Sequence, residues 1–393
     1  MTGQLELAEL ALWAVLAAPA VGVLGLTIFN AFFWPRGRAS ARWPDPVSVL
    51  IPARNEESGI EACLRSVFAN DHPIDEVIVC DDGSTDRTPD ILTRLQDEFP
   101  KLRVIEGIDL PAGWVGKPHA CHRLSEHARG DLFFFVDADV ELESDGISRA
   151  VSLLEDKRAD VVTAVPRQRT ETFFERLILP LLHLTYIAWL PMPLVWLTSD
   201  PRFLAANGQL LAIRRERYES TGGYSTVRSE VVDDMALCRL VKTSGGRVVF
   251  ADGHHMAECR MYDSAKEVWE GFSKNLFEGI GGRFIALVFV FALYGVTFVL
   301  PYAALIASLF VPQLLAPAAA GVGANLAVRL LLALRHKQPL EGVLLHPVSI
   351  FGFFAIAWNS YRWNVAGKIT WAGRVYASKA SRADVEAEEI AHG

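Results

Sequence analysis

Long apolar runs near both ends of the chain most constrain how it can fold. Residues 10–34 carry no charged side chain and are long enough to cross the roughly 30 Å hydrocarbon core of a bilayer. Residues 284–311 and 313–334 form two more such runs, and a shorter apolar run covers residues 340–358. The sequence therefore predicts one N-terminal and two to three C-terminal transmembrane helices.

Basic residues follow two of these runs and predict their orientation. Three arginines lie between residues 36 and 42, and basic residues occupy positions 335–337. The positive-inside rule then places the segment after Trp34 in the cytoplasm, so we expect a multi-pass protein of the cell (inner) membrane. A full crossing by residues 340–358 would place the basic residues after it outside, so this run is either a third C-terminal span or a re-entrant or interfacial segment.

Composition excludes some functions. The 393 residues carry a formal net charge of −8, which argues against a nucleic-acid partner on electrostatic grounds. The 5 cysteines are odd in number and show no Cys-x-x-Cys spacing, which indicates reduced thiols rather than a disulfide framework.

The middle of the chain, residues 47–272, has the pattern of an α/β domain. Short apolar runs alternate with amphipathic stretches, which predicts a parallel sheet with helices on both faces. The predicted strands are 47–52, 76–80, 102–107, 131–137 and 160–165, and the predicted helices cover 56–70, 117–128 and 146–155, with another beginning at Thr88. Ligands of such sheets bind at the carboxyl ends of the strands.

Acidic residues follow three of the predicted strands. The first strand leads into residues 52–57, the second into 81–84, and the strand at 131–137 into Asp137-Ala138-Asp139. Alternation along a strand would point Asp137 and Asp139 the same way. Carboxylates gathered at one edge repel each other unless a cation joins them, and Mg²⁺ or Mn²⁺ takes oxygen ligands together with phosphate oxygens. An isolated Asp-x-Asp also fits a surface turn or a helix cap, but the three strand ends together favour a metal and nucleotide site.

Several motifs together resemble a known family. "SVLIPARNEE", "VIVCDDGSTDRT", "FFFVDADVEL", "NGQLLAIRRERYESTGGY" and "VVDDMALCRL" span about 200 residues and resemble the inverting GT-A glycosyltransferases of family 2. "GWVGKPHACHRL" is similar to a segment of a membrane-bound subgroup that includes carotenoid (hydroxychlorobactene and diaponeurosporenoate type) and hopanoid-associated glycosyltransferases. The resemblance implies a Rossmann-like nucleotide-sugar domain with a mixed or parallel sheet.

The same resemblance implies roles for individual residues. The nucleotide-sugar site would contain Pro52, Ala53, Asn55, Glu56, Asp82, Lys117, Asp137 and Lys274, the metal would lie on Asp139 and Asp137, and the catalytic pair would be Asp233 and Asp234. Within this set, Asp234 is the expected base and Lys117 contacts the nucleotide or its diphosphate. The pair Asp233-Asp234 is also compatible with capping a helix, and the upstream motifs favour the catalytic role.

One family motif is absent. We find no Gln-x-x-Arg-Trp, which processive relatives carry, so the sequence favours transfer of one sugar over polymer synthesis. Lys274 or Arg283 would then neutralise phosphate in its place.

The apolar segment 173–200 predicts where the acceptor binds. It is apolar enough for a span, yet a crossing here would separate Asp139 from Asp234, and three prolines interrupt it. We expect it to lie at the membrane interface, although a buried core hairpin would have the same pattern.

The sequence thus predicts a membrane-anchored transferase. We expect an N-terminal transmembrane anchor (1–35), a basic linker (36–46), a cytoplasmic catalytic domain (47–272), a C-terminal membrane region (273–375) and a polar tail (376–393). The predicted donor is a UDP-hexose, the predicted acceptor a membrane lipid such as a carotenoid or hopanoid, and the cofactor Mg²⁺ or Mn²⁺. A processive polysaccharide synthase and a non-catalytic membrane scaffold or transporter are the alternatives, and the oligomeric state is not predicted.

Overall fold

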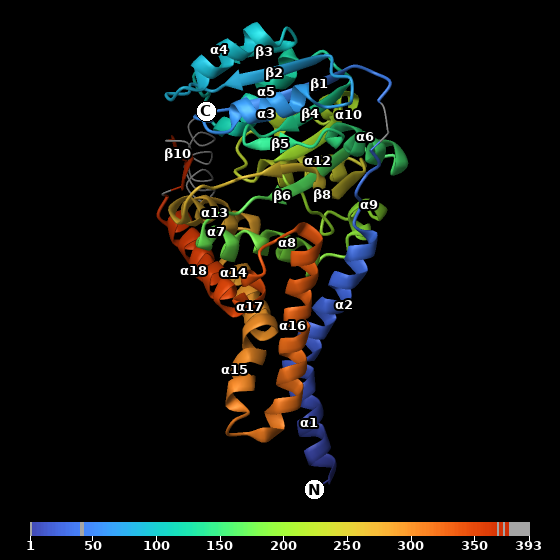
Figure 1. Ribbon diagram of the computed structural model, residues 1–393, viewed down its shortest axis with the longest axis vertical. Coiled ribbons are helices and arrows are strands. Elements are labelled where there is room, and N and C mark those ends of the chain that lie inside the picture. Colours follow the sequence, from blue (N-terminus) through green and yellow to red (C-terminus); the bar gives the residue numbers. More distant parts are fainter. Residues whose placement is uncertain (1, 40–42, 368, 372–373, 377–393) are drawn as a thin grey trace, which may run out of the picture. The chain divides into compact units, whose positions relative to one another are not determined.

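The computed structural model describes residues 2–39, 43–367, 369–371 and 374–376 (Figure 1). The chain forms two compact units. Residues 32–169 and 190–261 make a sheet unit, and residues 1–31, 170–189 and 262–393 make a helical unit. Part of the predicted basic linker (40–42) and nearly all of the predicted polar tail (377–393) lie outside the described residues.

An eight-stranded sheet organises the sheet unit, with the strand order β3-β2-β1-β4-β7-β6-β8-β5. Its strands are β1 (Val47–Ala53), β2 (Glu76–Asp81), β3 (Leu102–Glu106), β4 (Leu132–Val136), β5 (Val140–Leu142), β6 (Val161–Gln168), β7 (Leu210–Arg214) and β8 (Val248–Cys259). The first four positions in this order are parallel, as predicted. The sheet as a whole is mixed, because β7 runs antiparallel to both β4 and β6, and β5 runs antiparallel to β8.

Burial on both faces explains the apolar strand sequences. In β4, Phe134 and Val136 belong to one hydrophobic cluster, whereas Phe133 and Phe135 belong to the cluster on the opposite face. Successive side chains of a strand point to opposite faces, so a strand covered on both sides needs an apolar residue at every position. The run "LFFFV" is therefore the sequence of a central strand.

The helices of the sheet unit confirm most predictions. They are α3 (Ile60–Phe68), α4 (Thr88–Glu98), α5 (Gly116–His127), α6 (Gly146–Asp156), α9 (Pro193–Leu197), α10 (Arg215–Ser220), α11 (Gly223–Thr226) and α12 (Asp233–Thr243). The helix predicted over 56–70 is wrong in its first turn. Asn55 adopts a left-handed backbone with φ of 58°, so the chain turns there and the helix begins only at Ile60.

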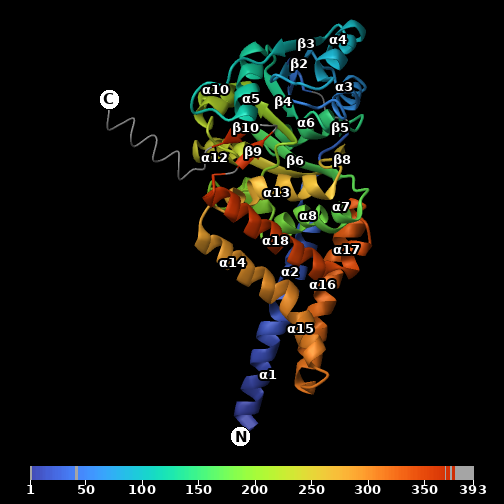
Figure 2. The same ribbon diagram turned by 90° about the vertical axis from the view of Figure 1, so that its left-hand side faces the viewer.

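The helical unit consists mainly of helices (Figure 2). They are α1 (Thr2–Leu16), α2 (Ala18–Phe33, which ends in the sheet unit), α7 (Phe173–Ile178), α8 (Pro180–Ile187), α13 (Ala265–Gly279), α14 (Phe284–Tyr294), η1 (Gly295–Val299), α15 (Leu300–Ala307), η2 (Pro312–Leu314), α16 (Leu315–His336), α17 (Glu341–Leu344) and α18 (His346–Val365), followed by the hairpin of β9 (Ile369–Trp371) and β10 (Arg374–Tyr376).

Two continuous helices among the described residues are long and apolar enough to cross a membrane. They cover Phe284–Ala307 and Pro312–His336, in agreement with two of the predicted C-terminal spans. Residues Glu6–Leu16 and Ala18–Phe33 pass the same test only as a pair, bent by 44° at the break. The run at 340–358 divides between α17 and α18 and is not among these helices.

The apolar segment 173–200 does not form a straight span. It divides into α7, α8 and α9, and the last two begin at Pro180 and Pro193. Proline lacks the amide hydrogen that a helix interior requires, which explains why new helices start at these positions. Its location at a membrane interface stays a prediction.

Candidate active site at the carboxyl ends of the strands

Backbone and side-chain hydrogen bonds join the loops that follow β1 and β2. The Arg54 guanidinium donates to the carbonyl of Asp82 and, at 3.2 Å, to that of Gly83. The Asn55 amide N–H donates to Ser84 Oγ at 2.9 Å. Asn55 Oδ1 in turn accepts from the backbone N–H of Thr85 at 2.8 Å. Two of the three strand ends singled out in the sequence therefore form one connected surface, in which Asn55 holds the loops together.

Asp82, the first residue after β2, belongs to the second of these loops. It is buried, and its backbone N–H donates to the carbonyl of Ala53, the last residue of β1, at 2.8 Å. A Cβ at Gly107 would lie 2.7 Å from Asp82 Cα, so only glycine fits at that position of the chain after β3. Pro52 occupies the preceding position of β1, in register with Cys80 of β2.

The Asp-x-Asp motif lies in a turn rather than in a strand. β4 ends at Val136, and the backbone N–H of Val140 donates to the carbonyl of Asp137 at 3.1 Å. The alternation expected of a strand therefore does not set the directions of these side chains. Asp137 Oδ1 lies 2.5 Å from Lys117 Nζ, an ion pair between the turn and α5.

Asp139 has a buried carboxylate oxygen that could bind a cation. Among the described residues its Oδ1 is buried without a hydrogen-bond partner. Burial, with a further contribution from the Asp137 carboxylate, raises the pKa of Asp139 to about 6. A buried carboxylate oxygen without a donor, close to a second carboxylate, suits a divalent cation with oxygen ligands. The residues present thus fit the predicted metal.

Glu56 shares this environment. Burial and the carboxylates of Asp139 and Asp137, in that order, raise the pKa of Glu56 to about 8. A Cβ at Gly59 would lie 3.1 Å from Asp139 Cα, so the loop after β1 and the Asp-x-Asp turn meet. The raised pKa favours the protonated form of the Glu56 side chain, which can donate a hydrogen bond.

Asp233 and Asp234 begin α12 and are not its cap. The capping position is Val232, whose side chain makes no capping hydrogen bond. Asp234 Oδ1 accepts from the adjacent backbone N–H of Met235 at 2.7 Å, and burial raises its pKa. Burial raises the pKa of Asp233 to about 7, against the lowering effect of Lys117, and Asp234 raises it further.

Gly208, in the loop before β7, brings the two halves of the site together. A Cβ at this position would lie 3.2 Å from Asp234 Cβ and 3.5 Å from Lys117 Nζ. Lys117 pairs with Asp137, so the Asp-x-Asp turn and the start of α12 face one site. No individual role was predicted for Gly208, although it lies in the motif "NGQLLAIRRERYESTGGY" just before an apolar strand.

Comparison with known proteins places this geometry in a family. Residues 48–210, which contain the strand ends and the Asp-x-Asp turn, match the sequence model described as "Glycosyl transferase family 2". These residues form a family 2 glycosyltransferase domain. Asp233 and Asp234 lie beyond the matched range.

Relatives of known sequence and structure agree with this family 2 domain. The chain is 29% identical over 240 residues to the 4,4'-diaponeurosporenoate glycosyltransferase of Staphylococcus aureus (strain USA300), a match that covers 60% of this chain and 62% of the relative. The chain thus spans about three fifths of the relative's length. The mannosyltransferase PcManGT from Pyrobaculum calidifontis, solved in complex with GDP-Man and Mn²⁺, shares the fold with a TM-score of 0.55 at 20% identity, over 90% of this chain and 99% of that one.

Lys117 is a cation within an otherwise acidic part of the family 2 domain. Burial lowers its pKa, but the carboxylates of Asp137 and Asp233 raise it more, so the ammonium stays charged. Lys274, the other predicted cation, lies on α13 of the helical unit, and its role stays a prediction.

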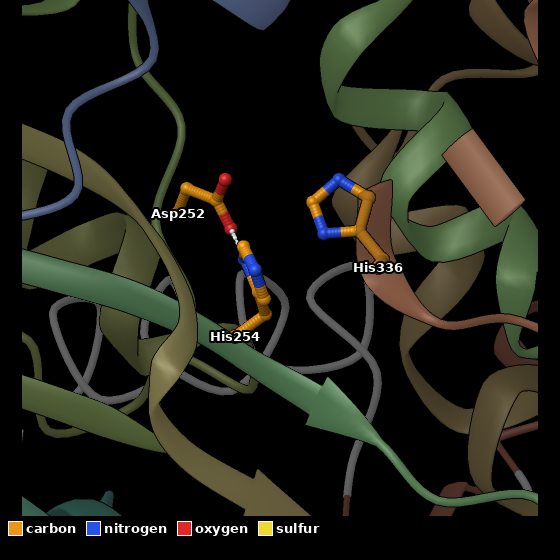
Figure 3. A group of neighbouring side chains, drawn as sticks. All are labelled: Asp252, His254 and His336. Carbon is orange, nitrogen blue, oxygen red and sulfur yellow. Dashed lines mark hydrogen bonds and ion pairs between the residues drawn. The ribbon is translucent and has the colours of Figure 1, made fainter. Parts of the chain in front are cut away.

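An aspartate–histidine pair in the sheet unit lies on β8, away from the motifs of family 2. Asp252 Oδ1 is 2.7 Å from His254 Nδ1 (Figure 3), and Asp252 Oδ2 is 3.3 Å from Arg36 Nε. The backbone N–H of Asp252 also donates to the carbonyl of Pro35 at 2.8 Å. These contacts fix the chain after α2 to the sheet, and the sequence analysis did not anticipate them.

Proposed function

We propose that this protein transfers a single sugar from a nucleotide-diphosphate donor, a UDP-hexose, to a lipophilic membrane acceptor such as a carotenoid or hopanoid, with inversion at the anomeric carbon. The observation that carries the proposal is the meeting of Asp137, Lys117 and Asp234 around Gly208 in a family 2 domain. The acceptor class is supported by the name of the S. aureus relative, a glycosyltransferase of diaponeurosporenoate.

The donor would bind over the joined loops after β1 and β2. Pro52, Ala53, Asn55 and Glu56 border the nucleotide pocket, and Asp82 accepts a hydrogen bond from the base or ribose. The Lys117 ammonium faces the diphosphate and neutralises part of its charge, an effect that is strong because the group is largely withdrawn from solvent.

A metal would lie between the Asp-x-Asp turn and the diphosphate. Asp139, through its unpartnered Oδ1, and Asp137 would hold Mg²⁺ or Mn²⁺, which when bound stabilises negative charge on the leaving diphosphate. The relative of the same fold was solved with Mn²⁺ and a nucleotide sugar.

Asp234 would act as the base. Its carboxylate takes the proton of the acceptor hydroxyl, and the hydroxyl oxygen forms a bond to C1 of the sugar. The bond from C1 to the diphosphate oxygen breaks, and its electron pair leaves with the diphosphate. One displacement inverts the anomeric centre and requires no covalent sugar–enzyme intermediate.

The helices would hold the enzyme in the cell (inner) membrane. Two helices of the helical unit and the bent N-terminal pair have the length and composition of spans. Basic residues at 36–42 and 335–337 favour a cytoplasmic catalytic domain, where nucleotide sugars are available.

Product analysis tests this proposal. The purified full-length chain is incubated with Mn²⁺, a total lipid extract and a panel of UDP- and GDP-hexoses, and lipids are examined by mass spectrometry. We expect one added hexose per acceptor, and a loss of at least about 100-fold in Asp234→Asn with nucleotide binding retained. Full activity of Asp234→Asn would refute its role as the base, and polymeric products would refute single transfer.

A further inference from the structure

A buried arginine lies on one of the candidate membrane spans. Arg329 belongs to α16, within the span Pro312–His336, and is only 2% exposed. A guanidinium stays charged at any physiological pH. In the part of the chain that the structure describes, Arg329 forms no ion pair, and its polar partners are two backbone carbonyls. A buried charge without an opposite charge is destabilising, so this residue calls for an anion.

The two carbonyls use only part of the guanidinium. Arg329 Nε donates to the carbonyl of Gly342 at 3.3 Å, and Nη1 donates to that of Pro180 at 3.4 Å. Both distances exceed the usual range of about 2.7–3.2 Å for such bonds. A Cβ at Gly342 would lie 2.8 Å from Arg329 Nη2, so glycine at this position of α17 gives the third nitrogen its space. Nη2 thus remains available to a further acceptor.

Polar groups continue along the same side of α16. Asn325 lies one helical turn before Arg329, and residues with this spacing share a face. Asn325 Nδ2 donates to the carbonyl of Thr297 at 2.9 Å. Thr297 belongs to η1, a π-helical turn, and such turns inside helices are frequent at functional sites. Asn325 Oδ1 and Thr297 Oγ1 are buried without a hydrogen-bond partner among the described residues.

The first residue of α18 adds another buried polar group to the helical unit. The ring of His346 lies 5.1 Å from that of Phe298 in η1, and both of its nitrogens are buried without a partner among the described residues. Buried polar atoms normally have partners, and a hydroxyl and an imidazole can each donate a hydrogen bond. The interior of this unit is therefore polar beside a permanent positive charge.

The position of Arg329 indicates which kind of anion reaches it. Arg329 lies two helical turns, about 10 Å along the axis, before His336, at the end of the span that basic residues 335–337 predict to be cytoplasmic. The exposed side chains of Leu340 and Leu344 lie on either side of Gly342 in the sequence and offer apolar contact to an acyl chain. These features fit an anion that is attached to a lipid.

We propose that Arg329 is the centre of an anion-binding site in the helical unit, which holds the phosphate or carboxylate group of a membrane lipid. Both groups offer the guanidinium two oxygens and a negative charge, which the carbonyls of Gly342 and Pro180 do not supply. The site goes beyond sugar transfer, because it involves none of the residues assigned to the donor, the metal or the base.

Lipid binding to the purified full-length protein in a non-ionic detergent, measured by native mass spectrometry, tests the proposal. The probes are two matched pairs: phosphatidylglycerol with diacylglycerol of the same chains, and oleate with oleyl alcohol. We expect at least one anionic lipid to bind about 10-fold or more tightly than its neutral counterpart. A preference for phosphatidylglycerol identifies the ligand as a phospholipid, and a preference for oleate identifies it as a lipid carboxylate.

Two variants locate this preference. Arg329→Met removes the charge, and Gly342→Ala keeps every charge but displaces Nη2, so both should abolish the preference. Lys337→Met removes an exposed cation directly after the same helix and should retain it. Circular dichroism checks folding, and if Arg329→Met does not fold, Gly342→Ala alone decides. Equal binding of charged and neutral lipids by the native protein, or an unchanged preference in the folded variants, would overturn the proposal.

Discussion

The two acids that begin α12 set the expected pH dependence of transfer. A base must be deprotonated to act, so kcat/KM falls as the pH drops through the pKa of Asp234, which burial holds above the ordinary value for aspartate. Asp233 and Asp234 are adjacent acids. The Asp234 carboxylate raises the pKa of Asp233, and such coupling between two carboxylates is reciprocal. We predict that Asp233→Asn shifts the acidic limb of kcat/KM to lower pH. An unchanged limb, measured with a saturating metal concentration, would mean that another group titrates.

The site requires a residue without a side chain at position 208. Because a Cβ there would lie 3.2 Å from Asp234 Cβ, Gly208→Ala must push the base away from Lys117. Displacements of this kind reduce kcat by about 10–100-fold without unfolding the protein. Steady-state kinetics and a thermal melt together check this. The matched control is Gly279→Ala, where no atom lies within 4 Å of the added Cβ and φ is not positive, as at Gly208. Wild-type kcat in Gly208→Ala would contradict the geometry.

The sequence predicts a site residue when a neighbouring sequence pattern, such as a preceding apolar strand, marks its position. Asp137, Asp139 and Asp82 follow apolar strands directly, so their gathering at one edge was predictable from the parallel β1, β2 and β4. Gly208 carries no such signal. It reaches the site only because β7, the strand that follows it, pairs with β4, a strand far away in the chain.

At the scale of elements, Lys242 of α12 holds the segment between α9 and β7. It is 1% exposed, and its ammonium donates to the carbonyls of Val195 and Phe203 at 2.6 Å each. Lys242→Met leaves both carbonyls without this donor and should lower the free energy of unfolding by about 1–3 kcal/mol. Arg239→Met, on the exposed face of the same helix, is the control and should have little effect.

The pH dependence of that stability provides a second check. Burial lowers the pKa of Lys242, so the unfolded chain binds its proton more tightly than the folded protein does. The stability contributed by this residue therefore rises as the pH increases toward the ordinary pKa of lysine. Thermal melts in detergent at neutral and alkaline pH should show this rise for Arg239→Met and a smaller rise for Lys242→Met. Equal pH dependence in the two variants would contradict it.

The direction of β7 within the sheet could not be predicted from the sequence. Residues 210–213 are all buried and read as a strand, but an apolar run has the same composition whichever way it pairs. Its antiparallel pairing with β4 and β6 depends on the path of the chain between residues 169 and 209. This segment forms the short helices α7, α8 and α9. That path is set by packing, and no local pattern encodes it.

At the scale of the whole molecule, the membrane topology is the property most open to a direct test. The five native cysteines are free and buried, so a membrane-impermeant maleimide should label the native protein weakly. Exposed positions offer sites for single new cysteines. Gln313 lies in the first turn of the second candidate span, next to the connection from the first, and Asp97 lies on α4 of the sheet unit.

If both candidate spans cross the membrane and residues 335–337 stay in the cytoplasm, Gln313 must be outside and Asp97 inside. We therefore predict that intact cells label Gln313→Cys strongly and Asp97→Cys only after the membrane is permeabilised. Transfer activity of both variants in membranes shows that they fold, because neither position belongs to the proposed active site. Labelling of Asp97→Cys in intact cells would show that the orientation is the reverse of the predicted one. Protection of Gln313→Cys until permeabilisation would mean that these helices enter the membrane without crossing it.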